Sequence, residues 1–219
     1  YYFSWVYRYD AATNTYPGIY DGVVYDRNGV LIATVPPGGT WNCWQYTSYT
    51  YWWSSTDAVY YYTPFIWTLN CPTSNGTYLV LGDAVIAASV GSTVNPWITT
   101  ILAYGSINVT APSVVVRPPL STETTLYRSQ TKNLLFVADM DVLIMGSPSQ
   151  SFTGITSAYQ QVGISGNPTY NGYILAQDVG NTATYYYGTN FVASNYISGN
   201  MTLTYNGDVA TGSQGNAIP

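Results

Sequence analysis

Few residues in this chain have side chains that could carry out chemistry. Asp139 and Asp141 are closely spaced, and in a strand the i, i+2 spacing places both carboxylates on one face. Such a pair can act as acid and base or bind a hard cation. The strand-like surroundings favour a different interpretation, in which both are the polar side of a half-exposed strand. We therefore predict no catalytic residue, no metal site and no cofactor.

The absence of histidine restricts the possible enzyme classes further. With no His in its 219 residues, the chain cannot form a Ser-His-Asp or Cys-His catalytic site. Cys43 and Cys71 are its two cysteines, and metal binding is disfavoured because no His and no second Cys pair completes a site. A single Cys pair in a secreted chain is most simply a disulfide. We expect a non-enzymatic protein with a Cys43–Cys71 disulfide.

Lys132 is the only lysine. In some extracellular β-sandwich filament proteins a Lys condenses with an Asn beside a carboxylate to form an isopeptide cross-link. Asn133, Asp139 and Asp141 lie near Lys132 in the sequence, so such a bond is one possibility. A solvated surface lysine is the favoured alternative.

Three Asn-X-Ser/Thr sequons offer sites for N-glycosylation: Asn75-Gly76-Thr77, Asn108-Val109-Thr110 and Asn200-Met201-Thr202. Asn75 and Asn200 lie in turn-like segments that a glycosyltransferase can reach. Asn108 lies in a predicted strand and needs an outward-facing side chain. We predict covalent N-glycans if the chain is secreted in an archaeon or a eukaryote.

The elements that must position these residues are all predicted to be strands. The first ten residues alternate strictly, with aromatic residues at the odd positions Tyr1, Phe3, Trp5, Tyr7 and Tyr9. Successive side chains in a strand point to opposite faces, so this segment presents a continuous aromatic stripe that must be buried. The small and polar segment that follows is typical of a hinge.

Beyond the hinge, many short β-branched and aromatic segments are separated by Gly, Pro and Asn. Segments 19–24 and 30–35 flank Asn28-Gly29, which predicts a hairpin. Long strands are predicted over 41–53, 78–90, 107–116 and 134–145, and no internal repeat is visible. The pattern predicts an all-β fold, an antiparallel immunoglobulin-like or pilin-like sandwich, with residues 1–11 as an N-terminal strand and 12–219 as one domain.

Composition and charge indicate the environment. Charged residues make up 7% of the chain, whereas about 25% is average for globular domains. Hydroxyl and amide groups keep their hydrogen bonds when carboxylates are protonated, so we expect a protein that tolerates acid or heat, with a neutral-pH secreted β protein as the alternative. The net charge of −5, with only five scattered cations, argues against nucleic-acid binding. No apolar run reaches the length of a membrane span.

The aromatic N-terminal strand, the hinge and the all-β body together resemble a filament subunit built by donor-strand complementation, as in bacterial type I pilins. The Tyr-rich, His-free and Lys-poor composition with sequons is similar to the archaeal thread filament subunits of Sulfolobales. The resemblance implies a glycosylated cell-surface filament for adhesion, biofilm formation or cell contact. Tyr1, Phe3, Trp5, Tyr7 and Tyr9 would then fill the groove of the next copy in a head-to-tail homopolymer. The initial Tyr predicts secretion with removal of a leader.

Two other functions remain open. One is a virion or surface-layer structural protein of a thermoacidophile, in which the N-terminal strand is an arm exchanged within a closed shell. The other is a secreted carbohydrate-binding module, in which exposed aromatic residues of 46–53 and 60–62 stack on sugars. Core packing is the favoured role of those aromatic residues.

Overall fold

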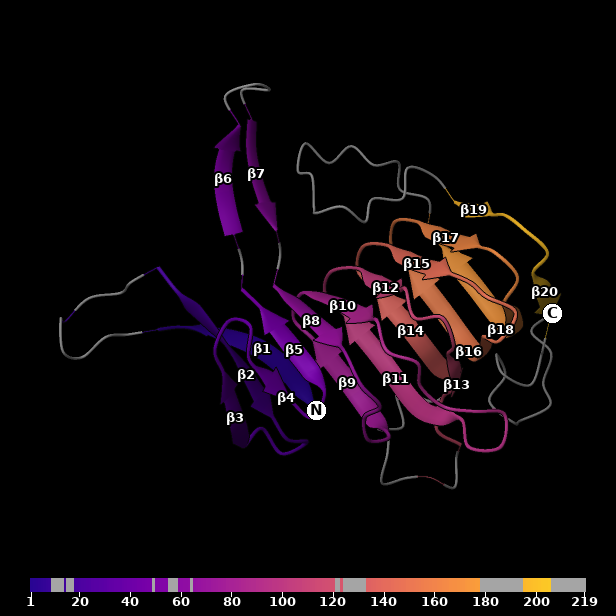
Figure 1. Cartoon of the computed structure of the whole chain (residues 1–219), viewed down its shortest axis with the longest axis horizontal. Helices are drawn as coiled ribbons and strands as arrows, with labels where there is room; N and C mark the ends of the chain where they lie inside the picture. Colours follow the sequence, from indigo (N-terminus) through magenta and orange to yellow (C-terminus); the bar gives the residue numbers. More distant parts are fainter. Residues whose placement is uncertain are drawn as a thin grey trace.

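A computed structural model of the chain describes residues 1–8, 14, 18–48, 50–54, 59–63, 65–120, 123, 133–177 and 195–205, with the side chains of 50–54 and 59–63 left out. In these residues all the regular structure is β-strand, which confirms the all-β prediction. Two sheets face each other, and a separate hairpin of β6 (Thr50–Ser54) and β7 (Val59–Thr63) projects from the body (Figure 1).

The larger sheet has ten strands. In spatial order they are β20 (Thr202–Thr204), β18 (Thr169–Ala176), β16 (Ser151–Ala158), β13 (Val115–Arg117), β11 (Trp97–Ala103), β9 (Gly76–Val80), β1 (Tyr2–Tyr7), β2 (Tyr20–Tyr25) and β3 (Leu31–Val35), with β14 (Leu134–Ala138) also placed between β11 and β16. The smaller sheet runs β19 (Tyr196–Ile197), β17 (Val162–Ser165), β15 (Val142–Met145), β12 (Ile107–Val109), β10 (Asp83–Ile86), β8 (Ile66–Leu69), β5 (Trp44–Thr47) and β4 (Thr40–Trp41).

From β8 onward the chain alternates between the two sheets, except that β13 and β14 both lie in the larger one, and consecutive strands do not pair with each other. Each strand from β9 on instead pairs in parallel with strands of the neighbouring turns, as β10 does with β8 and β12. The result is a β-solenoid, in which the chain winds in successive turns and each turn contributes strands to both sheets (Figure 1). This corrects the prediction of an antiparallel, immunoglobulin-like sandwich, because in the described residues antiparallel pairing occurs only among β1 to β8.

Short corners explain why long predicted strands are broken. The predicted strand 78–90 is two strands, β9 and β10, which meet at Leu81-Gly82. The predicted strand 134–145 is likewise β14 and β15, separated by a corner at 139–141. At these corners the chain crosses from one sheet to the other, and Gly82 permits the tight turn because its φ is +136° and an added Cβ would lie 2.2 Å from the Phe65 carbonyl oxygen.

The antiparallel part of the fold includes the predicted hairpin. β2 and β3 pair around Asn28-Gly29, and Gly29 has a φ of +80°, which confirms the prediction. The Asp26 carboxylate accepts hydrogen bonds from the backbone N–H groups of Asn28 and Val30, at 2.8 and 2.9 Å. The predicted long strand 41–53 is divided instead, because Asn42 and Cys43 both have positive φ and form a tight turn between β4 and β5.

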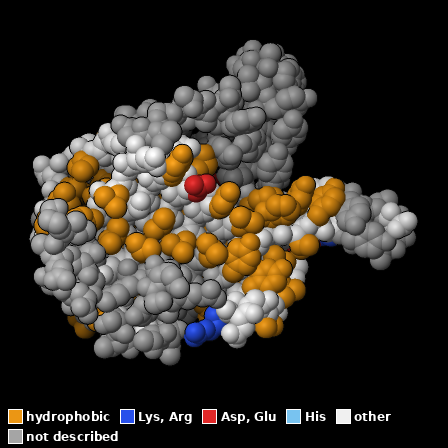
Figure 2. All heavy atoms as spheres, turned by 180° about the vertical axis from the view of Figure 1, so that it is seen from behind, with side chains coloured by type: hydrophobic (Ala, Val, Ile, Leu, Met, Phe, Trp, Pro, Cys, Tyr) orange, Lys and Arg blue, Asp and Glu red, His pale blue; other side chains and the backbone are white. Residues whose placement is uncertain are grey.

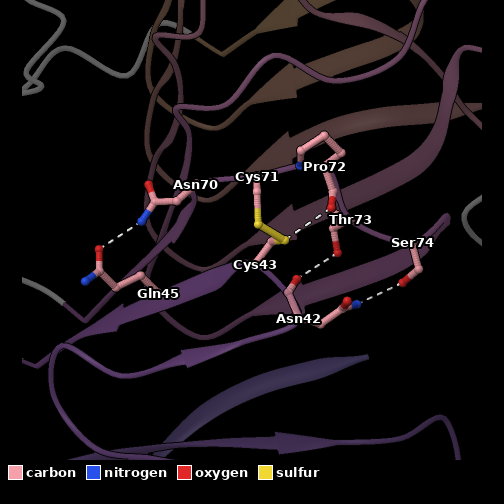
Figure 3. The surroundings of a disulfide bond; sticks show 8 residues. All are labelled: Asn42, Cys43, Gln45, Asn70, Cys71, Pro72, Thr73 and Ser74. Carbon is pink, nitrogen blue, oxygen red and sulfur yellow. Dashed lines mark hydrogen bonds between the residues drawn. A yellow bond between two sulfur atoms is a disulfide. The ribbon is translucent and has the colours of Figure 1, made fainter.

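The predicted disulfide between Cys43 and Cys71 is present, with Cα atoms 5.1 Å apart (Figure 3). It joins the β4–β5 turn to the segment that follows β8. Hydrogen bonds surround it: Thr73 Oγ1 donates to the Asn42 carbonyl oxygen at 2.9 Å, and Asn70 Nδ2 donates to Gln45 Oε1 at 2.9 Å. The disulfide therefore fixes the antiparallel strands to the first turn of the stack.

We predict that the double substitution C43A/C71A lowers the free energy of unfolding by about 3 to 4 kcal/mol, because the unfolded chain regains the freedom of the loop that the bond closes. Urea unfolding of both proteins, with and without reductant, measures the difference. Reductant should destabilise the wild type and leave the variant unchanged. Equal stability of the oxidised wild type and the variant would contradict the prediction.

Candidate assembly site

The strand β1 lies inside the larger sheet and has a partner on each side. It pairs antiparallel with β2 from Tyr2 opposite Tyr25 to Tyr7 opposite Tyr20. On its other side it pairs in parallel with β9, where the Leu79 and Leu81 N–H groups donate to the Tyr1 and Phe3 carbonyl oxygens at 2.9 and 2.8 Å. Both edges of β1 are thus used by strands of its own chain.

The predicted aromatic stripe occupies one face of β1. Phe3 is at its centre and is completely buried, with its ring stacked on Trp67 at a centroid distance of 4.6 Å. The Trp44 and Tyr78 rings surround it at 5.3 and 5.6 Å. The ring of Phe3 therefore anchors β1 in the core between the two sheets.

The flanking stripe residues are half-exposed. Tyr1 contacts Trp41 with centroids 4.9 Å apart, and Trp5 stacks on Phe65 at 4.6 Å. Tyr1, Trp5 and Tyr7 each keep 37% of their surface exposed. Tyr9, the last residue of the predicted stripe, lies outside the described residues.

Gly22 allows the aromatic rings to approach β2 closely. It stands opposite Trp5 in the β1–β2 register, and a Cβ atom added to it would lie 2.7 Å from the Trp67 and Tyr46 rings. Any larger residue would have to displace these rings. Tyr46 is itself fully buried, which places it in the core rather than on a sugar-binding surface.

An ion pair marks the end of β1. The Arg8 guanidinium donates hydrogen bonds to both carboxylate oxygens of Asp21 on β2, through Nε at 2.8 Å and through Nη2. Asp21 is buried, with 8% of its surface exposed, while Arg8 is partly exposed. This pair holds the register of β1 and β2 where the chain leaves the sheet.

The structure separates the predicted Asp139–Asp141 pair. Both residues lie in the corner between β14 and β15, where Asp139 is exposed and Asp141 is buried. This corrects the expectation that both carboxylates lie on one face of a strand. In the described part of the chain, no three His, Cys, Asp or Glu residues gather into a metal site.

Asp141 belongs instead to a column of polar side chains at successive corners. Asp83 Oδ1 accepts a hydrogen bond from the Ser106 N–H at 2.7 Å, and Asp141 Oδ1 accepts one from the Gln161 N–H at 3.1 Å. Each carboxylate thus satisfies a buried backbone donor of the next turn. Sequence reasoning missed Asp83, because its partner Ser106 is far along the chain.

Burial raises the pKa of the Asp83 carboxyl to about 6; the hydrogen bond from Ser106 acts in the opposite direction, and the Asp141 charge raises the pKa further. The unfolded carboxyl has a pKa of about 3.9. Because the folded value is the higher one, Asp83 favours folding most below the unfolded pKa. This contribution is lost as the pH rises through about 6.

The predicted modification sites have different environments. Asn108 in β12 is fully buried, and neither of its side-chain amide atoms has a hydrogen-bond partner among the described residues. A glycan cannot be accommodated on a fully buried side chain, so the prediction of glycosylation at Asn108 is corrected. Asn75 and Asn200 are exposed. Lys132 lies outside the described residues.

The outer face of the larger sheet carries a row of hydrophobic side chains. Cross-strand register aligns Tyr2, Leu79, Leu102, Val137 and, beyond Ser157, Leu175. Leu79 and Leu175 are 44% and 52% exposed. Figure 2 shows hydrophobic side chains in such a row, and they border a shallow groove of about 560 Å³.

These features define the class of the chain: an all-β protein in which a parallel stack is joined to antiparallel strands through an aromatic N-terminal strand. Compared with protein-family models, curated proteins and solved structures, the chain matches none. No helix in the described residues could cross a membrane.

We predict that Asp83→Asn removes part of the pH dependence of stability, because an amide keeps an oxygen acceptor for Ser106 but does not titrate. Between pH 7 and pH 4 the wild type should gain on the order of 2 kcal/mol relative to the variant. Denaturant unfolding over this pH range measures both proteins. Parallel stability curves would contradict the proposed burial of the carboxylate.

We also predict that Phe3→Ala lowers the free energy of unfolding by about 3 to 5 kcal/mol, because it leaves a cavity among the rings of the core. Val6→Ala is the matched control, since Val6 is on the opposite face of β1 and 46% exposed. Its cost should stay below about 1 kcal/mol. Similar losses for both variants in thermal or urea unfolding would show that the ring of Phe3 is not the anchor.

Proposed function

We propose that this chain is the structural subunit of an extracellular, pilus-like filament in which copies join head to tail by exchanging β1. The observation that carries the proposal is the position of β1: an N-terminal strand paired on both edges inside a sheet, with a fully buried Phe3. When β1 leaves, it opens a groove between β2 and β9. The β1 strand of another copy fits the same groove by the same contacts.

The length of chain around β1 supports such an exchange. The segment 9–18 connects β1 to β2 and, fully extended, spans at most roughly 35 Å. This reach allows β1 to leave its own sheet and enter that of a neighbour. When each copy gives its β1 to the next copy and receives β1 from the one before, the contact is heterologous, and a heterologous contact that does not close on itself produces an open fibre.

The energy of the joint comes from aromatic burial. Phe3 stacks on Trp67 and is fully buried, so its ring contributes roughly 1.5 to 3 kcal/mol. Trp5 stacks on Phe65 but keeps 37% of its surface exposed, so it contributes less. The exchanged state keeps these contacts and the hydrogen bonds to β2 and β9. Closed monomer and filament therefore differ mainly in the conformation of the connecting segment. The equilibrium between the two states depends on the protein concentration.

Further features support a location outside the cell. The Cys43–Cys71 disulfide is stable in oxidising surroundings. Exposed Asn75 and Asn200 remain the proposed glycan sites, and Asn75 Oδ1 already accepts a hydrogen bond from the Ile98 N–H at 2.9 Å. The raised pKa of Asp83 favours folding in acid. The proposed roles are adhesion, biofilm formation and cell contact.

The hydrophobic row on the outer face of the larger sheet favours a second candidate, a surface-layer or virion protein of the same kind of habitat. Exposed apolar rows on one face are typical of surfaces that other chains cover. Lateral contacts between copies would bury Leu79 and Leu175. Electron micrographs distinguish the candidates, because lateral assembly produces sheets or closed shells rather than single threads.

We predict that the double variant S4C/V23C reports strand exchange directly. Ser4 and Val23 stand opposite each other in the β1–β2 register, and opposite residues of paired strands have Cβ atoms about 4.5 to 5.5 Å apart, close enough for a disulfide after small adjustment. In exchanged filaments the new bond joins different copies. Non-reducing denaturing gels should then show a ladder of multimers that reductant collapses to monomer.

The single variant Ser4→Cys is the control, since it can form dimers but no ladder. A second control lacks residues 1–11 and should stay soluble while binding a synthetic peptide of residues 1–10. If oxidised S4C/V23C in assembled material runs only as monomer, β1 stays in its own chain and the proposed joint is wrong. Fibres formed by the truncated chain would have the same consequence.

A further inference from the structure

A close tyrosine pair connects the last two described turns of the stack. Tyr173 lies on β18 and Tyr205 directly follows β20, with ring centroids 4.6 Å apart and ring planes at 69°. The two phenol hydroxyls share a hydrogen bond. Because the hydroxyls are hydrogen-bonded and the rings are close, the ring carbons ortho to each hydroxyl lie near the other ring.

The strand that precedes Tyr205, β20, has few other attachments among the described residues. β20 pairs with β18 over only three registered positions, from Thr202 opposite Thr169 to Thr204 opposite Asn171. Its residues are all exposed, and Leu203 has 51% of its surface open to solvent. A covalent bond between Tyr173 and Tyr205 would fasten this turn to the one before it.

Solvent can reach the pair. Tyr205 is 71% exposed and Tyr173 is partly exposed, so a small oxidant has access to both phenols. The hydrogen bond to Tyr205 raises the pKa of the Tyr173 phenol to about 12, which keeps it protonated at neutral pH. Its oxidation therefore removes a proton together with an electron.

We propose that Tyr173 and Tyr205 are a site of oxidative modification and couple to a dityrosine cross-link that fastens the last described turn of the stack. Each phenol loses one electron and one proton to give a tyrosyl radical. The two radicals form a carbon–carbon bond between ortho carbons, and the hydrogen on each coupled carbon then moves to its oxygen, restoring both rings. The oxidant, a peroxide used by a peroxidase, takes up two electrons and two protons and is reduced to water.

Among the described tyrosines, Tyr7 and Tyr20 form the other close pair, with ring centroids 4.7 Å apart and ring planes at 36°. The Tyr173–Tyr205 pair is distinguished by the hydrogen bond between its hydroxyls and by the 71% exposure of Tyr205. Tyr2 and Tyr25 also face each other across β1 and β2, but their rings are stacked at 26° with centroids 5.8 Å apart. Tyr1 is near Tyr78, but Tyr78 is fully buried and inaccessible to an enzyme-generated oxidant. The cross-link does not depend on β1 exchange, since both residues lie at the opposite end of the sheet.

The test treats the dilute full-length protein with hydrogen peroxide and a peroxidase, then applies mass spectrometry. We expect digestion to release a linked peptide pair that contains Tyr173 and Tyr205, with a mass lower by two hydrogen atoms than the sum of the two peptides. The variant Tyr205→Phe should lose this linked pair, because phenylalanine forms no phenoxyl radical. Tyr104→Phe is the matched control, as Tyr104 is 68% exposed, and it should keep the linked pair.

Two outcomes would overturn the inference. One is oxidised wild-type protein without a Tyr173–Tyr205 linkage. The other is a set of cross-links that is the same in wild type and Tyr205→Phe, which would show coupling at other tyrosines. Circular dichroism of the variants before oxidation confirms that each is folded, so that loss of the linkage reports the loss of the phenol.

Discussion

The fold depends on one strand that pairs in two different ways. β1 runs parallel to β9 and antiparallel to β2, so it joins the parallel stack to the antiparallel strands that precede it. A parallel stack leaves backbone donors and acceptors unpaired at its first turn. β1 covers that edge in the larger sheet, and β5 covers it in the smaller sheet. Phe3 then packs between the sheets against Trp44 and Trp67, and the hydrogen bonding of β1 is thereby coupled to the aromatic core.

The corners of the stack impose a second constraint. Wherever the chain crosses between sheets, buried backbone N–H groups need acceptors from the turn before. Asp83 and Asp141 supply carboxylate oxygens for this purpose and are themselves almost fully buried. Burial and the Asp141 charge raise the pKa of Asp83, so the charged form of Asp83 is costly at neutral pH and this cost is smaller in acid. The same column that makes the stack possible thus makes its stability dependent on protonation, in a chain that has few charges elsewhere.

The proposed filament uses the double pairing of β1 with β2 and β9, and it needs no contacts beyond those that β1 makes in its own chain. A strand that completes the sheet of its own chain can complete that of an identical neighbour, because every contact is repeated. The unusual feature is the number of rings that β1 brings to these contacts, with Trp5 on Phe65 and Tyr1 on Trp41 beside the central Phe3. The outer face of the same sheet remains available for lateral contacts between threads. Assembly along the thread and between threads would therefore use opposite faces of one sheet.

The sequence by itself determined the local features of this protein. Period-2 alternation identified the strand that contains Phe3, Asn28-Gly29 identified the hairpin, and the two cysteines identified the disulfide. Only the tertiary structure decided which strands are neighbours. A segment such as 134–145 has the same composition whether it is one strand or two strands around a corner, and unequal connections between turns conceal the repeat. The burial of Asn108 and Asp141 likewise depends on partners from distant segments. Alternation and turn propensity act between adjacent residues, whereas parallel pairing and burial are set by residues far apart in the chain.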